Sequence, residues 1–282
     1  MTRQVQHCFI APTQYLHLIP KKSKTHLLLA HLLEDDAYCE FYRNRKKNGD
    51  YIIVDNGAFE FKRPLSADEI FRLVGKAGFM PDVVVAPDYP FEHWGKTVSS
   101  TIDFSKRYHQ YFDATVKLMA VPQSKKGNWK GWIECYKQLA DVSNVDWLGM
   151  SILGIPNAFC SLTGTDDISF NRTFATAYLI AEGIVRTNRK HHYLGCGDPR
   201  ELITMCVQGV ADTNDSSTAF WHAINGIAFD DSAGGLKDGK LAVEVDFDLP
   251  FDAAHTKLIK SNIKWIGRLD KIDSRATKPA AK

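Results

Sequence analysis

Short apolar segments alternate along the chain with longer segments of helical period. The segments at 52–54 and 83–86 are apolar at successive positions and mostly β-branched, a pattern typical of parallel strands covered on both faces. The predicted strands are residues 8–11, 51–55, 82–88, 117–123, 147–153, 192–197 and 209–215. An eighth strand is either 226–230 or 241–247.

Helical segments lie between these strands. Ser66 followed by Glu69 has the spacing of a capping box, in which each residue bonds the backbone amide of the other. Asp198 before Pro199 predicts a helix that begins at the proline. A helix over 169–187 is predicted to have one apolar face, formed by Phe170, Phe174, Ala177, Tyr178, Ala181 and Val185.

Alternating strands and helices predict an α/β fold, a closed (β/α)₈ TIM-type barrel rather than an open, doubly wound sheet. No GxGxxG motif follows the first strand, which argues against a dinucleotide-binding fold. The chain has 282 residues, 44% of them hydrophobic, which suits one barrel domain. We expect a single barrel over 1–255, without a zinc subdomain, and a basic C-terminal helix and tail over 256–282.

The composition predicts a soluble cytoplasmic protein. No apolar run approaches the ~20 residues of a transmembrane helix, and the first residues lack the apolar region of a signal peptide. The six cysteines are scattered without a CxxC pair, so neither a disulfide framework nor a closed zinc site is expected. Most cysteines are expected to be small buried side chains. We expect no bound metal and no membrane partner.

Charge is unevenly distributed along the chain. The net charge is +2, but residues 257–282 contain eight Lys or Arg and two Asp, so this end carries +6 and the rest about −4. A basic tail fits a polyanionic partner, and a solvated, frayed C-terminus explains the same pattern. Candidate phosphate contacts, each of which an ordinary solvated face also explains, are Lys125, Lys126, Arg43, Arg45, Lys264 and Arg268.

Polar residues stand where the predicted strands end, at the edge of an α/β barrel where its chemistry takes place. These residues are Asp55, Asp88, Gln123, Ser151, Gly195 and Asp215. A single aspartate at such a position is often a helix N-cap. Three carboxylates with an amide and an open glycine backbone fit a polar heterocycle held by its edge. Two of the carboxylates then remain for acid/base or nucleophilic work.

Neighbouring residues extend this set. Asn56 can orient the edge of a ligand or, equally, cap the turn after Asp55. Phe59 can stack on a planar base, although a buried core phenylalanine is the commoner arrangement. The glycine at 195 allows either close approach of a ligand or only a tight turn. Trp94, Trp132 and Trp221 are further stacking candidates, with core packing expected for Trp132.

Six segments, in this order, resemble motifs of the tRNA-guanine transglycosylase superfamily. They are DNGAFE at 55–60 (the family's DSGG(F/Y)Q), APD at 86–88 (its base-recognition aspartate), AVPQ at 120–123 (IVQG), LGMSILG at 148–154 (GGLAVG), YLGCGDP at 193–199 (YLMGVGTP) and GVADTND at 209–215 (GVDMFD). The match covers about 51–215.

The resemblance implies that Asp215 is the nucleophile and Asp55 the acid/base residue. The base-binding set, from the resemblance and the residues above, is Asp88, Gln123, Asn56, Phe59, Ser151, Leu194 and Gly195. The implied reaction exchanges a guanine in nucleic acid for a free 7-deazaguanine through a covalent aspartate–sugar intermediate. It needs no cofactor, and a guanine in a duplex has to be flipped out of the stack.

Three departures from the family pattern matter. The CxCxxC…H zinc site with its C-terminal extension is missing, and so is the basic segment after the nucleophile that helps to bind tRNA. The glycine pair of the fifth-strand motif is Gly149-Met150 here. The chain is short and resembles most the compact relatives in bacteriophages and bacterial modification clusters that place 7-deazaguanines in DNA. We expect DNA as substrate and a base of the preQ0 type, with tRNA as the alternative. A phage-encoded enzyme acting in the host cytoplasm is one option.

Two other classes of protein remain open. Accessory subunits of transglycosylase systems share the barrel and bind nucleic acid without catalysis, but such a subunit would be expected to lose Asp55 or Asp215. A barrel glycoside hydrolase also uses paired carboxylates, but it does not explain Gln123, Gly195 or the basic tail. The sequence leaves open the oligomeric state, the identity of the 7-deazaguanine and the nucleotide context.

Overall fold

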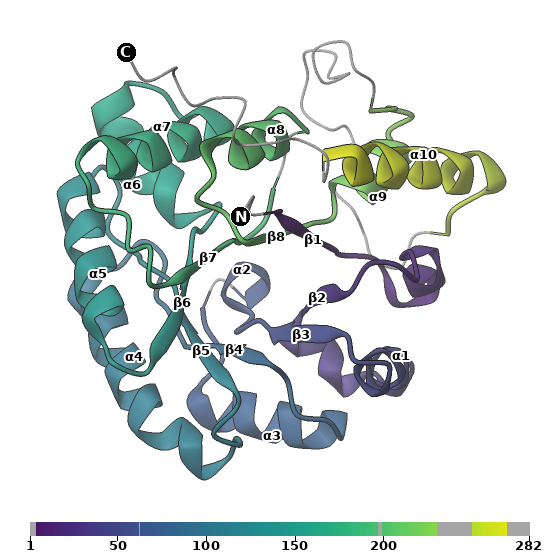
Figure 1. Ribbon diagram of the computed structural model, residues 1–282, viewed down its shortest axis with the longest axis horizontal. Coiled ribbons are helices and arrows are strands. Elements are labelled where there is room, and N and C mark those ends of the chain that lie inside the picture. The colour runs from purple at the N-terminus through teal and green to yellow at the C-terminus, as the bar shows by residue number, and fades with distance from the viewer. Residues whose placement is uncertain (1–3, 62, 197–198, 230–249, 270–282) are drawn as a thin grey trace.

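The computed structural model describes residues 4–61, 63–196, 199–229 and 250–269. Eight strands form one parallel sheet in the order β1-β8-β7-β6-β5-β4-β3-β2. Because β1 also contacts β2, the sheet curls into a nearly closed barrel. Helices surround the strands (Figure 1). The architecture is the predicted (β/α)₈ TIM-type barrel.

The elements follow one another as alternating strands and helices. The strands are β1 (Gln6–Phe9), β2 (Thr25–Leu28), β3 (Tyr51–Val54), β4 (Val83–Val85), β5 (Lys117–Ala120), β6 (Val145–Gly149), β7 (Lys190–Tyr193) and β8 (Thr213–Ser216). The α-helices are α1 (Asp36–Lys47), α2 (Ala58–Phe61), α3 (Ala67–Ala77), α4 (Trp94–Arg107), α5 (Trp129–Asp141), α6 (Gly154–Thr163), α7 (Ile168–Ala181), α8 (Pro199–Gln208), α9 (Thr218–Ile224) and α10 (Ala253–Leu269). Short 3-10 helices are η1 (Thr13–Leu18), η2 (Ala30–Glu34) and η3 (Tyr108–Gln110).

The strand that completes the barrel, β2, lies early in the chain rather than late. The alternative at 226–230 is wrong over 226–229, which contain a turn and no strand, and 241–247 lie outside the described residues. The sequence pattern missed β2 because its first two residues, Thr25 and His26, are polar and yet buried. His26 Nε2 lies 3.0 Å from the Asp50 carboxylate, which gives this ring nitrogen a partner inside the core.

Two helix starts follow their sequence signals. Ser66 Oγ accepts the Glu69 N–H at 3.3 Å, and Glu69 Oε2 accepts the Ser66 N–H at 2.6 Å, which confirms the capping box before α3. α8 begins at Pro199, as predicted, and the expected N-cap Asp198 lies outside the described residues.

The predicted apolar face of the helix over 169–187 is only partly correct, since Phe174, Tyr178 and Val185 pack against the core. α7 ends at Ala181, and Phe170, Ala177 and Ala181 are exposed on it. The buried face instead carries Asn171, Arg172, Ala175, Thr176 and Leu179. Polar side chains can face the barrel here because they find partners there: Thr176 Oγ1 lies 2.7 Å from Tyr193 Oη.

Two clusters of apolar side chains build the core. The cluster inside the barrel consists of Cys8, Ile10, Leu27, Leu29, Ile53, Val83, Val85, Met119, Val121 and Trp147. A larger cluster fills the space between strands and helices and includes Trp132, which is fully buried as expected. Five of the six cysteines are buried and Cys160 is half-buried, which confirms the prediction for most of them. The barrel interior is a packed core rather than a channel.

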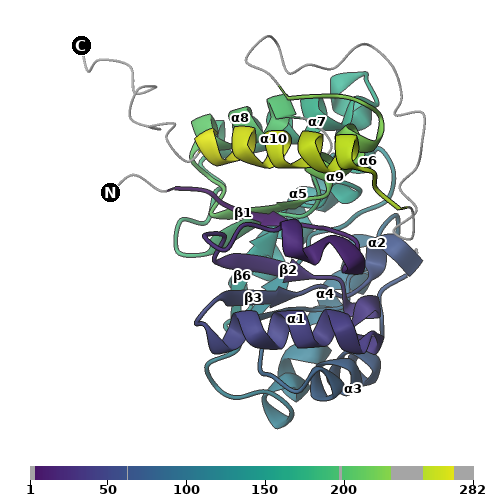
Figure 2. The ribbon, with the colours of Figure 1, turned by 90° about the vertical axis from the view of Figure 1, so that its right-hand side faces the viewer.

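The C-terminal helix α10 packs on α9 and α8 (Figure 2). Its buried face includes Ile259, Ile263 and Ile266, whereas Lys264 and Arg268 are exposed. The expected tail beyond residue 269 lies outside the described residues. In the described part of the chain, no helix combines the length and apolar character needed to cross a membrane.

Candidate active site

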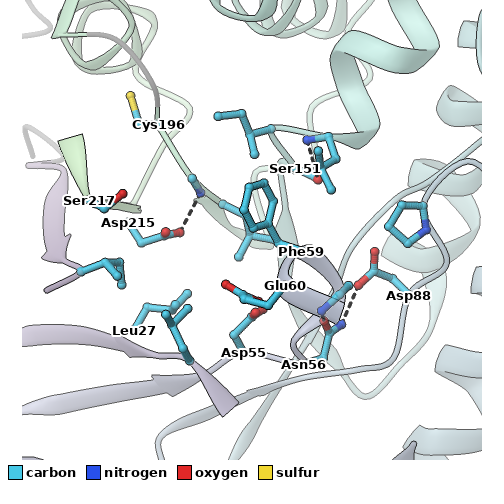
Figure 3. Close-up of a pocket in the computed structure, with 18 of the residues that line it drawn as sticks. Leu27, Asp55, Asn56, Phe59, Glu60, Asp88, Ser151, Cys196, Asp215 and Ser217 are labelled. Carbon is cyan, nitrogen blue, oxygen red and sulfur yellow. Dashed lines mark hydrogen bonds between the residues drawn. The ribbon is translucent and has the colours of Figure 1, made fainter. Parts of the chain in front are cut away.

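A pocket of about 310 Å³ opens at the carboxyl ends of the strands. All nine residues predicted for catalysis and base binding line it, namely Asp55, Asn56, Phe59, Asp88, Gln123, Ser151, Leu194, Gly195 and Asp215. They come from the ends of β3 to β8 or from the loops that follow these strands. In Figure 3, Asp215 and Asp88 stand on opposite sides of the pocket and Asp55 lies between them.

Asp55 follows β3, and only 9% of the residue is exposed. Its Oδ2 accepts the Gly57 N–H at 3.1 Å, in a turn where Gly57 has a φ of 72°. Burial raises the pKa of Asp55 to about 7, with further contributions from the charges of Glu60 and Asp215. A carboxyl group that titrates near neutrality can give up a proton and take it back, as acid/base catalysis requires.

Asp215 lies in β8, and two donors hold its carboxylate. Its Oδ1 accepts the Gly195 N–H at 2.9 Å and lies 3.0 Å from His192 Nε2. His192 is fully buried in β7, and its Nδ1 lies 2.6 Å from Thr213 Oγ1. Among the described residues both partners of Asp215 contact Oδ1, so Oδ2 is the oxygen available to attack an electrophilic carbon.

Asp88 follows β4 and is held by two amide side chains. Asn56 Nδ2 donates to its Oδ1 and Gln123 Nε2 to its Oδ2, both at 2.6 Å. Burial raises the pKa of Asp88 to about 7, although the two amide donors oppose the shift. Each carboxylate oxygen can accept a second hydrogen bond, so Asp88 is a rigid acceptor for N–H groups on a ligand edge.

Asn56 caps the turn after Asp55, as one of its two readings predicts, and it also holds Asp88. Its Nδ2 donates to Asp88 and to the Ala86 carbonyl, the latter at 2.7 Å. Its Oδ1 accepts the Ala58 N–H at 2.9 Å, which caps the turn into α2. Asn56 therefore links the orientation of Asp88 to the turn that carries Phe59.

Ser151 caps the start of α6 with its side chain. Its Oγ accepts the N–H groups of Leu153 and Gly154, both at 3.1 Å, and its carbonyl accepts the Ile155 N–H at 3.2 Å. The N–H of Ser151 is therefore the backbone group of this residue that remains for a ligand within the described structure.

Gln123 depends on a glycine that the sequence did not single out. Its Nε2 is engaged by Asp88, and its buried Oε1 has no hydrogen-bond partner among the described residues. A Cβ on Gly154 would lie 2.3 Å from this oxygen, so only glycine leaves room for the Gln123 side chain. A buried acceptor without a partner is costly, which favours a donor supplied by the ligand.

Two apolar side chains border the space between the carboxyl groups. Phe59 lies on α2 and is 50% exposed, so it is a pocket residue and not the core phenylalanine that was the alternative. Leu194 packs against the inner core cluster, and a Cβ on Gly149 would lie 2.8 Å from its Cδ1. The neighbouring Met150 is fully buried in the outer cluster, so the change from Gly-Gly to Gly-Met adds no side chain to the pocket lining.

Several pocket residues were not predicted as site residues. The polar ones are Glu60, Cys196, Ser217 and Thr218, and an apolar part is formed by Ile10, Leu27 and Leu29. Glu60 ends the DNGAFE segment, and Figure 3 shows its carboxyl group next to that of Asp55. Trp221, by contrast, was among the stacking candidates. His192 contacts Asp215 from β7 and was not predicted as a site residue. The one sequence signal for His192 is its position two residues before Leu194.

The predicted phosphate-binding residues lie outside the pocket lining. Lys125 and Lys126 are exposed in the loop after β5. Arg43 donates to the Ala77 carbonyl at 3.0 Å, and Arg45 donates to the Pro20 carbonyl at 2.8 Å. The two arginines of α1 therefore have structural contacts, and Lys125, Lys126 and Lys264 are exposed.

No protein-family model matches the chain, and the search of curated proteins gives no significant match. Within the described residues, no group of three or more His, Cys, Asp or Glu side chains is placed to hold a metal ion. The pocket itself is therefore the evidence for function. Two buried carboxyl groups there differ in their partners: the pKa of Asp55 is raised to about 7, while Asp215 is fixed by two N–H donors. Such a pair suits double displacement at a sugar carbon.

Proposed function

We propose that the protein is a guanine transglycosylase that exchanges a guanine in DNA for a free 7-deazaguanine of the preQ0 type. The observation that carries the proposal is the joint placement of Asp55, Asp215 and the Asn56–Asp88–Gln123 group in one pocket. These groups supply an acid, a nucleophile and a rigid hydrogen-bonding edge. The resemblance of the six strand-end segments supports the same assignment.

In the first half of the reaction, Asp215 Oδ2 attacks C1′ of the target nucleotide. The bond from C1′ to the guanine ring nitrogen breaks, and Asp55 gives its proton to the departing base. The products are free guanine, an ionised Asp55 and an ester between Asp215 and the sugar. The raised pKa of Asp55 supports this step, because an aspartate with an ordinary pKa would hold no proton to give near neutrality.

In the second half, a 7-deazaguanine takes the place of guanine. Asp55 removes the proton from its ring nitrogen, which attacks C1′ and breaks the ester to Asp215. Two displacements at C1′ retain the configuration of the sugar, and Asp55 ends the cycle protonated as it began. The two bases differ little in structure, so one pocket serves both halves.

Base recognition falls to the other pocket residues. Asp88 accepts from the N–H groups of the guanine edge, the Ser151 N–H donates to a ring acceptor, and Gln123 Oε1 accepts a further N–H. Phe59 and Leu194 cover the faces of the ring. A volume of about 310 Å³ suits a bicyclic base with part of its sugar and excludes a stacked base pair, so the target base has to be flipped out.

The choice of DNA over tRNA rests on the sequence, because the zinc site and the basic tRNA-binding segment of the family pattern are missing. Exposed cations, among them Lys125, Lys126 and Lys264, are candidates for phosphate contacts, and Arg268 is a further exposed cation. The oligomeric state is open, and we place the reaction in the cytoplasm, either of the encoding cell or of a phage host.

The test is incubation of the purified protein with radiolabelled guanine and, separately, with duplex DNA, single-stranded DNA and bulk tRNA. We expect label to enter DNA with the wild type and not with Asp215→Ala. Label in tRNA alone would keep the chemistry and replace the substrate. Nucleic-acid binding without label in any substrate would favour an accessory subunit, and release of reducing sugar from glycans would favour a glycoside hydrolase.

A further inference from the structure

Arg172 is a buried charge that lies outside the pocket. It is on the inner face of α7 and has no exposed surface. Its Nε lies 3.0 Å from Glu201 Oε1 on α8, and Glu201 is only 2% exposed. A buried ion pair adds little stability compared with apolar side chains of the same size, so its presence calls for another explanation.

The guanidinium group contacts three successive residues at the end of β7 and in the loop that follows it. Its Nη1 donates to the Gly195 carbonyl and, at 3.4 Å, to the Leu194 carbonyl. Its central carbon lies 5.3 Å from the centre of the Tyr193 ring. Glu201 contacts the same loop, because Cys196 Sγ lies 3.2 Å from Glu201 Oε2. The ion pair therefore fastens the loop from the outer side.

The inner side of this loop forms part of the pocket. Leu194 and Gly195 line it, and the Gly195 N–H donates to Asp215 Oδ1 at 2.9 Å. The Leu194 carbonyl and the Gly195 N–H belong to one planar peptide and point in opposite directions. Arg172 thus bonds the outer end of the same peptide whose inner end bonds Asp215.

The Leu194–Gly195 peptide needs such a restraint because Gly195 has a φ of 66°. In this region glycine can adopt several backbone conformations, so its own backbone does not fix the direction of the peptide. A Cβ at this position would lie 2.9 Å from Ile152 Cγ2, so a stiffer residue cannot replace the glycine. The Ile152 N–H also donates to the Leu194 carbonyl, at 3.0 Å. The loop is held by contacts from outside rather than by its own backbone.

We propose that Arg172 is a positioning residue, which fixes the Leu194–Gly195 peptide so that its N–H holds Asp215 and its leucine side chain stays over the bound base. The role of Asp215 as nucleophile rests on the proposed function. The coupling between Arg172, Gly195 and Asp215 does not, and it is measured separately.

The main variant is Arg172→Met with Glu201→Leu, which removes both charges together and keeps the volume, so that no unpaired charge is buried. Its matched control is Arg186→Met with Asp141→Leu, which removes an ion pair of 3.5 Å between exposed side chains away from the pocket. Arg172→Lys, with Glu201 retained, keeps the charge but not the planar group that reaches two carbonyls.

The first readout is the amide signal of Gly195. The chain has only three Leu–Gly pairs, 148–149, 153–154 and 194–195, so labelling leucine with carbonyl ¹³C and glycine with ¹⁵N selects three amides. We expect Asp215→Asn to move the Gly195 signal in the wild type and in the control, but by less than half as much in the Arg172→Met/Glu201→Leu background. An equal movement in all backgrounds would overturn the proposal.

The second readout is kinetic. We expect single-turnover formation of the covalent intermediate to slow on the order of 100-fold in the main double variant, because a misplaced nucleophile loses its alignment. Arg172→Lys should recover part of this rate, and the control should match the wild type. A normal rate in the folded double variant would contradict the positioning role. If the wild type forms no intermediate on any nucleic acid, the proposed function fails, and the amide experiment alone decides the coupling.

Discussion

His192 Nε2 lies 3.0 Å from Asp215 Oδ1, and the two side chains come from the neighbouring strands β7 and β8. His192 Nδ1 lies 2.6 Å from Thr213 Oγ1. The threonine hydroxyl can donate to Nδ1, and the ring then carries its proton on Nε2 and donates it to Asp215. Together with the Gly195 N–H, this arrangement fixes the plane of the carboxylate before substrate binds.

Replacement of His192 tests this arrangement. We expect His192→Leu to lower the rate of guanine exchange by about 10–100-fold, the effect of losing a hydrogen bond to a charged group. His192→Gln keeps an N–H donor and should lose less. Exchange rates at saturating base measure the effect, with thermal unfolding as the control for folding. A fully active, folded His192→Leu protein would show that Gly195 alone holds Asp215.

The raised pKa of Asp55 predicts the pH dependence of the first chemical step. Asp55 must be protonated to release guanine, so formation of the intermediate should slow as the pH rises through about 7. Asp55→Asn should react slowly at every pH and lose the part of this dependence that comes from Asp55, while Asp88, whose pKa is also raised to about 7, still titrates in this range. Rapid-quench measurements at pH values from about 5.5 to about 8.5 would give the profile. A rate that rises through pH 7 would assign the proton to another group.

The same pKa predicts an effect on stability. The folded-state pKa of about 7 lies above the ordinary aspartate value of 3.8, so this group binds more protons in the folded protein than in the unfolded chain between these values. Stability therefore falls as the pH rises through that window. Near pH 4, we expect Asp55→Asn to have about the same free energy of unfolding as the wild type. At pH 8, its free energy of unfolding should be higher by on the order of 1–4 kcal/mol. Urea unfolding at both values measures the difference, and a constant difference would contradict the burial argument.

Gly154→Ala tests the placement of Gln123. The new Cβ would lie 2.3 Å from Gln123 Oε1 and 3.2 Å from the Pro122 carbonyl, so the amide has to move away from Asp88. We expect the KM for the incoming base to rise roughly tenfold, the loss of about one hydrogen bond. The matched control is Gly75→Ala in α3, where a Cβ meets nothing within 4 Å and helix propensity favours alanine. An unchanged KM in Gly154→Ala would remove Gln123 from base recognition.

Much of the site was predictable because it depends on strand ends. Once the segments ending in Asp55, Asp88 and Asp215 are assigned as parallel strands, the barrel brings their carboxyl ends to one mouth. The residues that orient them were harder to find. Gly154 matters only because Gln123 lies beside it, a contact between different loops that spacing along the chain does not encode.

The failures share a physical cause, which is burial of polar side chains. Thr25 and His26 interrupt the apolar pattern of β2, yet His26 pairs with Asp50 in the interior. Arg172 and Thr176 lie on the inner face of α7, where an apolar face was expected. Hydrophobic periodicity assumes that polar residues face water. It fails where a polar residue has a partner inside the protein, as His26, Arg172 and Thr176 do.

The most direct test of the account is the mass of the protein after brief reaction with a guanine-containing DNA strand. We expect a covalent adduct whose added mass is that of the strand without one guanine. Digestion should place it on the peptide that contains Asp215, and Asp215→Asn should form none. An adduct on another residue, or guanine exchange that persists in Asp215→Asn, would contradict the central role given to Asp215.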